Sequence, residues 1–138
     1  MRILAIDPGK KRIGVAISDP TSTIASPLTV LQHTSRPLDA AAIANLANEH
    51  QVELIVVGKS LDDQGLPIPA SRRAERLVEA IQQQCDIPVI TWDESFSTQA
   101  ARQARIEMGV SRRKRKGHLD DLAATVILQS YLDARSGR

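Results

Sequence analysis

The order of apolar runs along the chain limits the fold more than any other feature of the sequence. Two short runs rich in β-branched residues, at 2–7 and 12–18, flank the turn-forming stretch Asp-Pro-Gly-Lys, which predicts a β-hairpin; a third strand is expected at 25–31. Further strand patterns at 53–58 and 87–94 alternate with helical patterns, so these strands are expected to be parallel. The sequence therefore predicts an α/β fold with a mixed sheet. Its first three strands are antiparallel, its later strands are parallel, and helices cover both faces.

Four helices are expected from apolar residues that recur every three or four positions, over residues 37–50, 69–85, 96–108 and 118–134. Pro37 suits the first turn of the first helix, where a backbone N–H is not needed. That helix is expected to bury one face, made of Leu38, Ala42, Leu46 and Ala47. With 138 residues and neither a repeat nor a linker, the chain is expected to form a single domain over residues 1–138.

Composition and cysteine content limit the class of protein. Hydrophobic residues make up 42% of the chain and charged residues 25%, which is ordinary for a globular domain that folds in water. Cys85 is the single cysteine, which excludes an internal disulfide and indicates a reducing compartment. The apolar run before Asp7 is too short for a signal-peptide core or a membrane span. We therefore expect a cytoplasmic protein with no membrane partner.

Positive charge is concentrated in one segment. The run RRKRK contributes five of the 18 Lys and Arg residues, which leaves 13 cations against 16 acidic residues in the rest of the chain. The segment is strongly basic while the remainder is slightly acidic. This distribution indicates an anionic partner that is held by a local element rather than by the whole surface.

Acidic residues end two of the expected strands. Asp7 follows the first strand directly, and Asp93 and Glu94 end the last one. In open α/β sheets, ligands bind beyond the carboxyl ends of the parallel strands, so this edge of the sheet is where a site is expected. The two strand ends therefore bring candidate carboxylates to one edge.

A third acidic position lies on the final helix, where two adjacent aspartates differ in their expected environment. At about 100° per residue, Asp121 falls on a polar stripe with Thr125, Gln129 and Asp133 and is expected to face water. Asp120 falls on the opposite face, which carries Ala123, Ala124, Ile127 and Tyr131. A carboxylate on a buried helix face needs a partner, because an isolated desolvated charge is too costly.

A divalent metal ion is the partner that fits these acids best. Mg²⁺ and Mn²⁺ take oxygen ligands and keep water positions open for phosphate oxygens, whereas three carboxylates without a metal repel one another. We therefore expect one or two Mg²⁺ or Mn²⁺ ions held by Asp7, Glu94 and Asp120. The histidines His33, His50 and His118 are scattered, so a zinc site is not indicated.

Each acid also has a structural explanation. Asp7 is a common turn former, and Asp93 and Glu94 are suited to the N-terminal end of a following helix. Asp120 is close to the start of its own helix. The conjunction of all three at one edge favours the metal site, while the choice between Asp93 and Glu94 stays open.

Basic residues flank this acidic edge in the sequence. Lys10, Lys11 and Arg12 follow Asp7, and the run Arg112, Arg113, Lys114, Arg115 and Lys116 precedes Asp120. An acidic centre with basic margins suits an enzyme that acts on phosphodiesters, because metal ions hold the scissile phosphate and cations hold its neighbours. Aromatic residues are only 2% of the chain, so recognition is expected through the backbone and shape of a nucleic acid rather than base stacking.

Four blocks of the sequence together resemble one known family. They are IDPGKKRIGVAISD, VVGKSLDDQG, TWDESFSTQAA and HLDDLAATVILQSYL, and they occur in the order found in the YqgF (RuvX-like) family. Proteins of this family have an RNase H-like fold and are described as Holliday junction resolvases and as nucleases that mature the small-subunit ribosomal RNA precursor. The resemblance covers nearly the whole chain.

The resemblance implies a role for individual residues. The first-strand aspartate of the family corresponds to Asp7, its strand-end acid to Asp93 or Glu94, with Glu94 our choice, and its final-helix aspartate to Asp120. Two departures stand out: Lys59-Ser60 replaces a Leu-Pro pair, and Ser95 replaces an arginine. Lys59 is therefore a candidate to replace the lost positive charge and to bind nucleic acid.

The function expected from these observations is metal-dependent endonucleolytic cleavage of structured nucleic acid, with 5′-end maturation of pre-16S rRNA in ribosome biogenesis as the first choice. The alternatives are a Holliday junction resolvase that acts on branched DNA and a non-catalytic RNA-binding factor of ribosome assembly. Ribosomal precursor particles are an expected partner, and both a monomer and a homodimer are compatible with the sequence. An actin-like ATPase domain shares the opening hairpin, but the chain is too short for two lobes.

Overall fold

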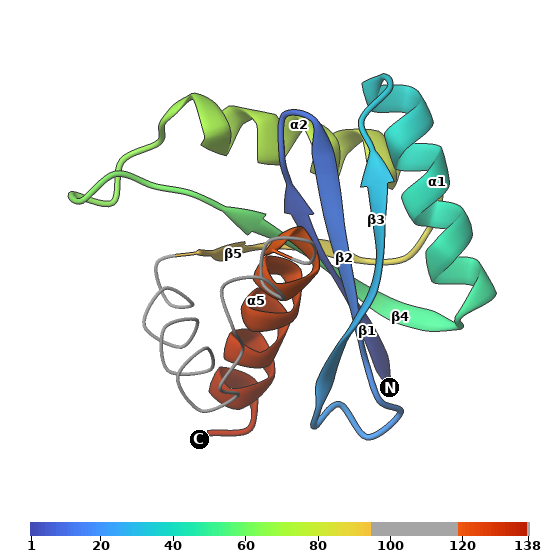
Figure 1. Ribbon diagram of the computed structural model, residues 1–138. Coiled ribbons are helices and arrows are strands. Elements are labelled where there is room, and N and C mark those ends of the chain that lie inside the picture. The colour runs from blue at the N-terminus through green and yellow to red at the C-terminus, as the bar shows by residue number, and fades with distance from the viewer. Residues whose placement is uncertain (95–118, 138) are drawn as a thin grey trace.

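The computed structural model describes residues 1–94 and 119–137, with the backbone alone described for residues 119–121. Its sheet has five strands in the order β3-β2-β1-β4-β5 (Figure 1). The strands are β1 (Arg2–Pro8), β2 (Arg12–Ser18), β3 (Ala25–Gln32), β4 (Val52–Lys59) and β5 (Val89–Asp93). Pairs β1–β2 and β2–β3 are antiparallel, and β1–β4 and β4–β5 are parallel. The predicted mixed sheet is confirmed.

Helices cover both faces of this sheet, as predicted. Helices α1 (Arg36–Glu49) and α2 (Pro69–Gln82) lie on one face, and α5 (Leu119–Arg135) crosses the other (Figure 1). The expected helix over 96–108 and the basic run over 112–116 lie outside the described residues. In the described part of the chain, no helix is long and apolar enough to span a membrane.

Side-chain alternation along β1 divides the core into two layers. Leu4 and Ile6 pack in the cluster that contains the buried residues of α1 and α2, whereas Ile3 and Ala5 pack with Ala124 and other residues of α5. Because successive strand residues point to opposite faces, Asp7 continues the row of Ile3 and Ala5. The end of β1 therefore presents Asp7 on the α5 face of the sheet.

The buried face of α1 differs from the prediction. Ala47 is buried as predicted and Leu46 packs half-buried against the core, but Leu38 is 63% exposed and the other buried apolar residues are Ala40, Ile43 and Ala44. Apolar residues occur on several sides of this helix, so its sequence does not decide which side is buried. Ser35 caps the helix by accepting a hydrogen bond from the Leu38 N–H at 3.4 Å, and Asp39 is buried because its carboxylate binds the chain just before the helix.

The predicted core face of α5 is confirmed at two positions, while the side chains of Asp120 and Asp121 lie outside the described residues. Ala124 and Ile127 are buried, as expected. Gln129, on the polar stripe, is half-buried and contacts the segment around β3: its amide oxygen accepts a hydrogen bond from the Ala25 N–H at 2.9 Å, and its amide nitrogen donates to the Thr23 carbonyl at 3.1 Å. Helix α5 therefore lies close enough to the start of β3 for the Gln129 side chain to form hydrogen bonds with the backbone there.

Candidate active site

The carboxyl ends of β1, β4 and β5 form the edge at which the predicted acids gather. The register pairs Ile6 of β1 with Val57 of β4, so Asp7 lies beside Gly58. Gly58 is in turn paired with Trp92 of β5. Three neighbouring strands thus end together, with the half-buried Asp7 on the first of them.

Glu94 reaches over Gly58 on the α5 side of the sheet. Its backbone N–H donates to the Lys59 carbonyl at 2.9 Å, which holds it at the end of β5. A Cβ atom placed on Gly58 would lie 2.7 Å from Glu94 Oε1 and 2.8 Å from the Cδ1 atom of Ile127 in α5. The Glu94 carboxylate therefore occupies the space that a side chain at position 58 would fill, against α5.

Asp7 and Glu94 consequently lie on the same face of the sheet, at the ends of β1 and β5, with Gly58 of β4 between them. Alternation along β1 places Asp7 on the α5 face, and the contact of Glu94 with the Gly58 site places its carboxylate there too. Asp93 is paired with Lys59 and precedes Glu94 by one residue, so alternation directs its side chain to the opposite face. The geometry thus favours Glu94 over Asp93 as the neighbour of Asp7.

Asp120 is the second residue of α5, and its side chain lies outside the described residues. It precedes Ala124 by one helical turn and Ile127 by about two turns. Since Ile127 lies against the Gly58 site, the N-terminal end of α5 is at the same edge as Asp7 and Glu94. Within the side chains that the structure describes, no group of three or more His, Cys, Asp or Glu residues is close enough to hold a metal ion.

The donors at this edge are suited to a hard divalent cation. Asp7 and Glu94 offer carboxylate oxygens, which are the ligands preferred by Mg²⁺ and Mn²⁺. Cys85 lies beyond the end of α2, and His33 is engaged with Asp39 on the other face of the sheet. The residues present therefore fit a Mg²⁺ or Mn²⁺ site rather than a zinc site.

Ser60 is a site residue that the sequence did not identify. Its hydroxyl donates a hydrogen bond of 2.6 Å to Glu94 Oε2. The Ser60 carbonyl accepts a hydrogen bond from the hydroxyl of Ser71, a fully buried residue in the first turn of α2, which also accepts a 3.0 Å hydrogen bond from the Ile68 N–H. In the sequence, the one indication that Ser60 belongs to the site was that position 60 departs from the family pattern. Ser60 fixes one oxygen of Glu94 and leaves the other over Gly58.

Removing this hydroxyl is expected to weaken the site without abolishing it. Residues that orient a metal-binding carboxylate typically contribute a factor of about 10–100 in metal affinity or activity, and we expect Ser60→Ala to fall in this range. Ser60→Thr, which keeps a hydroxyl, serves as the matched control and is expected to retain most of the activity. The measurement is cleavage rate as a function of Mn²⁺ concentration; equal Mn²⁺ dependence in Ser60→Ala and wild type would show that Ser60 does not position Glu94.

The predicted basic residues are placed in different environments. Lys10, Lys11 and Arg12 lie in and after the turn between β1 and β2, next to the acidic edge, and all three are exposed. Lys59 forms an ion pair with Glu75 of α2 at 2.5 Å, with its ammonium on the face opposite Glu94. Lys59 therefore does not compensate the acidic pair, and its contact with nucleic acid stays a prediction.

Comparison with known proteins identifies a family and several relatives. Residues 1–134 match the family model described as RuvX: Holliday junction resolvase. A Thermoanaerobacter pseudethanolicus protein named "Putative pre-16S rRNA nuclease" is 41% identical, with 100% of both chains covered. A protein of the same name from Caldanaerobacter subterraneus is 42% identical, with 98% of both chains covered.

Solved structures share the fold at low sequence identity. The Thermus thermophilus RuvC chain in complex with a Holliday junction substrate has a TM-score of 0.63 and 18% identity, with 99% of this chain and 96% of that chain covered. The fowlpox virus resolvase, in complex with Holliday junction DNA, has a TM-score of 0.56 and 17% identity, with 98% and 99% covered. The predicted RNase H-like fold is confirmed.

Proposed function

The chain belongs to the RuvX family of nucleases, and from this membership together with the Asp7–Glu94 pair we propose that it is a metal-dependent endonuclease acting on structured nucleic acid. Residues 1–138 act as one nuclease domain in this proposal. The observation that carries it is that the ends of β1 and β5, on either side of β4, present two carboxylates on the α5 face, beside an exposed basic turn.

In this proposal, the acidic residues of the site bind metal ions and the basic residues bind the substrate. Asp7 and Glu94, with Asp120 as the third acid, hold one or two Mg²⁺ or Mn²⁺ ions, and Ser60 orients Glu94. A bound divalent ion supplies an activated water and stabilises the charge on the leaving oxygen. Lys10, Lys11 and Arg12, and the run over 112–116, bind phosphates that flank the scissile one.

We propose precursor 16S rRNA as the substrate, cut during maturation of its 5′ end in the cytoplasm, on the free RNA or on ribosomal precursor particles. The names of relatives about 40% identical over their full length support this choice. The second candidate is resolution of Holliday junctions, which is supported by the description of the family. Both substrates are structured and highly charged, and the small number of aromatic residues suits recognition through backbone and shape.

One experiment separates these functions. The purified protein is incubated with a precursor 16S rRNA fragment and, separately, with a four-way DNA junction, each with Mn²⁺ and with excess EDTA. We expect Mn²⁺-dependent cleavage of the RNA at defined positions, slower or no cleavage of the junction, and none of either with EDTA. Faster cleavage of the junction would favour resolution instead. Tight, salt-sensitive binding of the RNA without cleavage under any metal would contradict the nuclease assignment and indicate a binding factor.

A further inference from the structure

Lys10, Arg36 and Arg73 line a cavity on the face of the sheet opposite Asp7 and Glu94. The cavity has a volume of about 170 Å³ and is formed by the turn after β1, by β2, by the β3–α1 connection, and by α1 and α2. Its lining residues are Gly9, Lys10, Ile13, His33, Arg36, Asp39, Arg73 and Leu77. Ile13 and Leu77 are buried members of the α1/α2 core cluster, which places the cavity on that side of the sheet.

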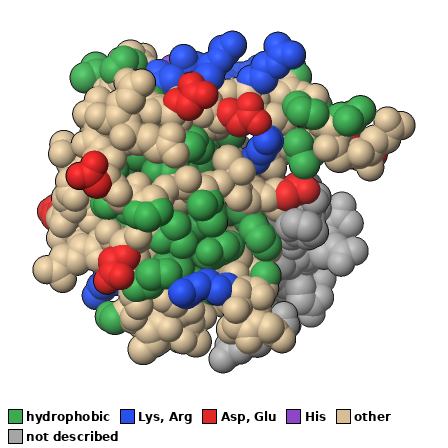
Figure 2. All heavy atoms as spheres, turned by 180° about the vertical axis from the view of Figure 1, so that it is seen from behind, with side chains coloured by type: hydrophobic (Ala, Val, Ile, Leu, Met, Phe, Trp, Pro, Cys, Tyr) green, Lys and Arg blue, Asp and Glu red, His purple; other side chains and the backbone are tan. Residues whose placement is uncertain are grey.

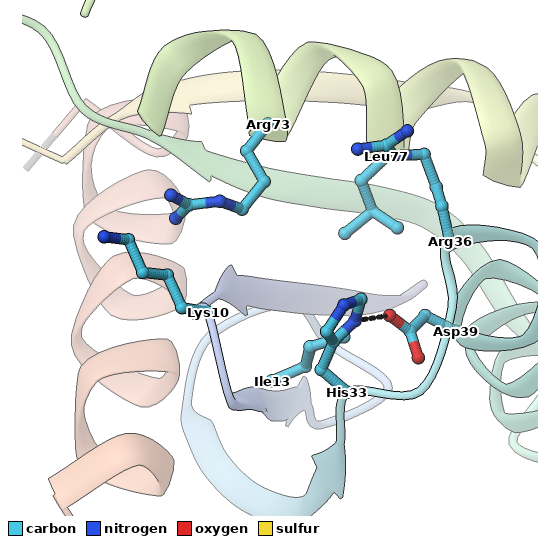
Figure 3. A pocket seen from close by; sticks show the side chains of 8 residues that line it. Lys10, Ile13, His33, Arg36, Asp39, Arg73 and Leu77 are labelled. Carbon is cyan, nitrogen blue, oxygen red and sulfur yellow. Dashed lines mark hydrogen bonds and ion pairs between the residues drawn. The ribbon is translucent and has the colours of Figure 1, made fainter. Parts of the chain in front are cut away.

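The three cations line the hollow from three separate segments. Lys10 and Arg73 extend toward one another from the β1–β2 turn and from α2, and Arg36 extends from α1 toward Leu77 (Figure 3). Seen from behind, Lys and Arg side chains gather along the top of the molecule, the side on which α2 and the β1–β2 turn lie in Figure 1 (Figure 2). Within the described part of the chain, no ion pair joins Lys10, Arg36 or Arg73 to a carboxylate.

Asp39 is the only carboxylate in the lining among the residues that the structure describes, and it already has hydrogen-bond partners. Asp39 is 5% exposed, and its oxygens accept hydrogen bonds from the Thr34 N–H at 3.1 Å and from the Thr34 hydroxyl at 3.3 Å, while one oxygen also contacts His33 Nδ1. Asp39 therefore fixes the wall of the cavity rather than neutralising its cations. Three cations against one engaged carboxylate leave the cavity with an excess of positive charge.

The position of Lys10 is fixed by the turn that carries it. The Gly9 N–H donates to the Arg12 carbonyl at 3.0 Å, and a Cβ atom on residue 9 would lie 2.3 Å from that oxygen, so only glycine allows this turn. The His33 N–H donates to the Lys11 carbonyl at 2.9 Å and ties the turn to the end of β3. The cavity is thus a built feature of the fold, and Lys10 in its lining is three residues along the chain from Asp7.

We propose that this cavity binds a phosphate group, either a phosphodiester of a bound strand at a distance from the cleaved bond or the phosphate of a small molecule. Its volume is below the roughly 300–1,000 Å³ of typical small-molecule sites, so it accommodates a single phosphate rather than a base pair. Two arginines offer the paired N–H groups that match phosphate oxygens, and Lys10 adds a point charge. The proposal goes beyond the proposed function, because it needs neither a metal ion nor cleavage.

The test uses the full-length protein in metal-free buffer with EDTA, so that its result does not depend on catalysis. Inorganic phosphate and a short single-stranded RNA are titrated separately, and binding is followed by the methyl resonances of Ile13 and Leu77. Arg73→Gln and Arg36→Gln are compared with Arg72→Gln, which alters the exposed neighbour of Arg73 that does not line the cavity. Thermal unfolding of each variant verifies that it folds.

We expect saturable shifts of both methyl groups and about tenfold weaker binding in Arg73→Gln and Arg36→Gln, with Arg72→Gln unchanged. If the ligand is a phosphodiester, RNA binds and the slope of log K against log salt falls by about 1 in Arg73→Gln. If it is a small-molecule phosphate, inorganic phosphate alone produces the shifts. Absence of saturable shifts with both probes, or equal losses in Arg72→Gln and Arg73→Gln, would overturn the proposal.

Discussion

Replacing Glu94 with Gln is expected to reduce the cleavage rate by about 10³-fold or more, whereas replacing the adjacent Asp93 with Asn leaves the rate close to wild type. The factor follows from the several kcal/mol that a correctly held divalent ion contributes to phosphodiester cleavage, at 1.36 kcal/mol per tenfold. Glu94 lies over Gly58 on the α5 face with Asp7, and Asp93 is directed to the other face. Asp7→Asn is expected to match Glu94→Gln for the same reason.

The pair Glu94→Gln and Asp93→Asn is a matched comparison, because both changes remove one carboxylate from adjacent residues and keep the side-chain size. Initial rates at saturating Mn²⁺ on the substrate that wild type cuts best give the two ratios. A loss of activity in Asp93→Asn with retention in Glu94→Gln would contradict the assignment of the acids to faces of the sheet.

Replacing Gly58 with Ala is expected to lower both stability and activity. The new Cβ would lie 2.7 Å from Glu94 Oε1 and 2.8 Å from Ile127 Cδ1, distances at which the neighbours must move. Overpacking of this kind costs about 1–3 kcal/mol, more than the roughly 0.5–1 kcal/mol by which Ala is favoured over Gly in a strand. Since Glu94 must leave its position, we also expect cleavage to fall by about 10–100-fold, as for loss of metal-ligand orientation. Chemical denaturation and cleavage assays measure the two effects.

The two contacts of Gly58 can be relieved separately. Ile127→Val removes the Cδ1 atom and by itself costs about 0.5–1.5 kcal/mol. In the double variant Gly58→Ala/Ile127→Val the clash with α5 is gone while the clash with Glu94 remains, so the losses in stability should be less than additive. Activity is expected to stay low. Recovery of full activity together with stability would show that Gly58 serves packing alone and does not make room for Glu94.

The strands of the sheet were predictable because their apolar runs are short, β-branched and bounded by turn residues. All five strands lie within two residues of their predicted limits. The alternation of β4 and β5 with helices was sufficient to predict that these strands are parallel. The buried face of α1 was not predictable in the same way. Alanine and leucine occur on several sides of this helix, and Leu38, the largest apolar residue of its first turn, is exposed.

The candidate site was predictable in its acids but not in their arrangement. Asp7 and Glu94 could be located from strand ends, but the choice between Asp93 and Glu94 depends on where β5 stops, and a shift of one residue exchanges the two faces. Ser60 contacts Glu94 across 34 residues of sequence, and no local pattern indicates such a pair. The cavity with Arg36 and Arg73 likewise exists only after α1 and α2 pack on the sheet.

Mn²⁺ binding tests the central claim most directly, namely that Asp7 and Glu94 together hold a divalent metal ion at the carboxyl edge of the sheet. Titration calorimetry in the absence of nucleic acid compares wild type with Asp7→Asn, Glu94→Gln and Asp93→Asn. We expect Mn²⁺ to bind saturably to wild type and Asp93→Asn, and at least about tenfold more weakly to the other two variants, since outer-shell changes alone reach that factor. Unchanged Mn²⁺ affinity in both Asp7→Asn and Glu94→Gln would show that these two acids do not hold the metal ion.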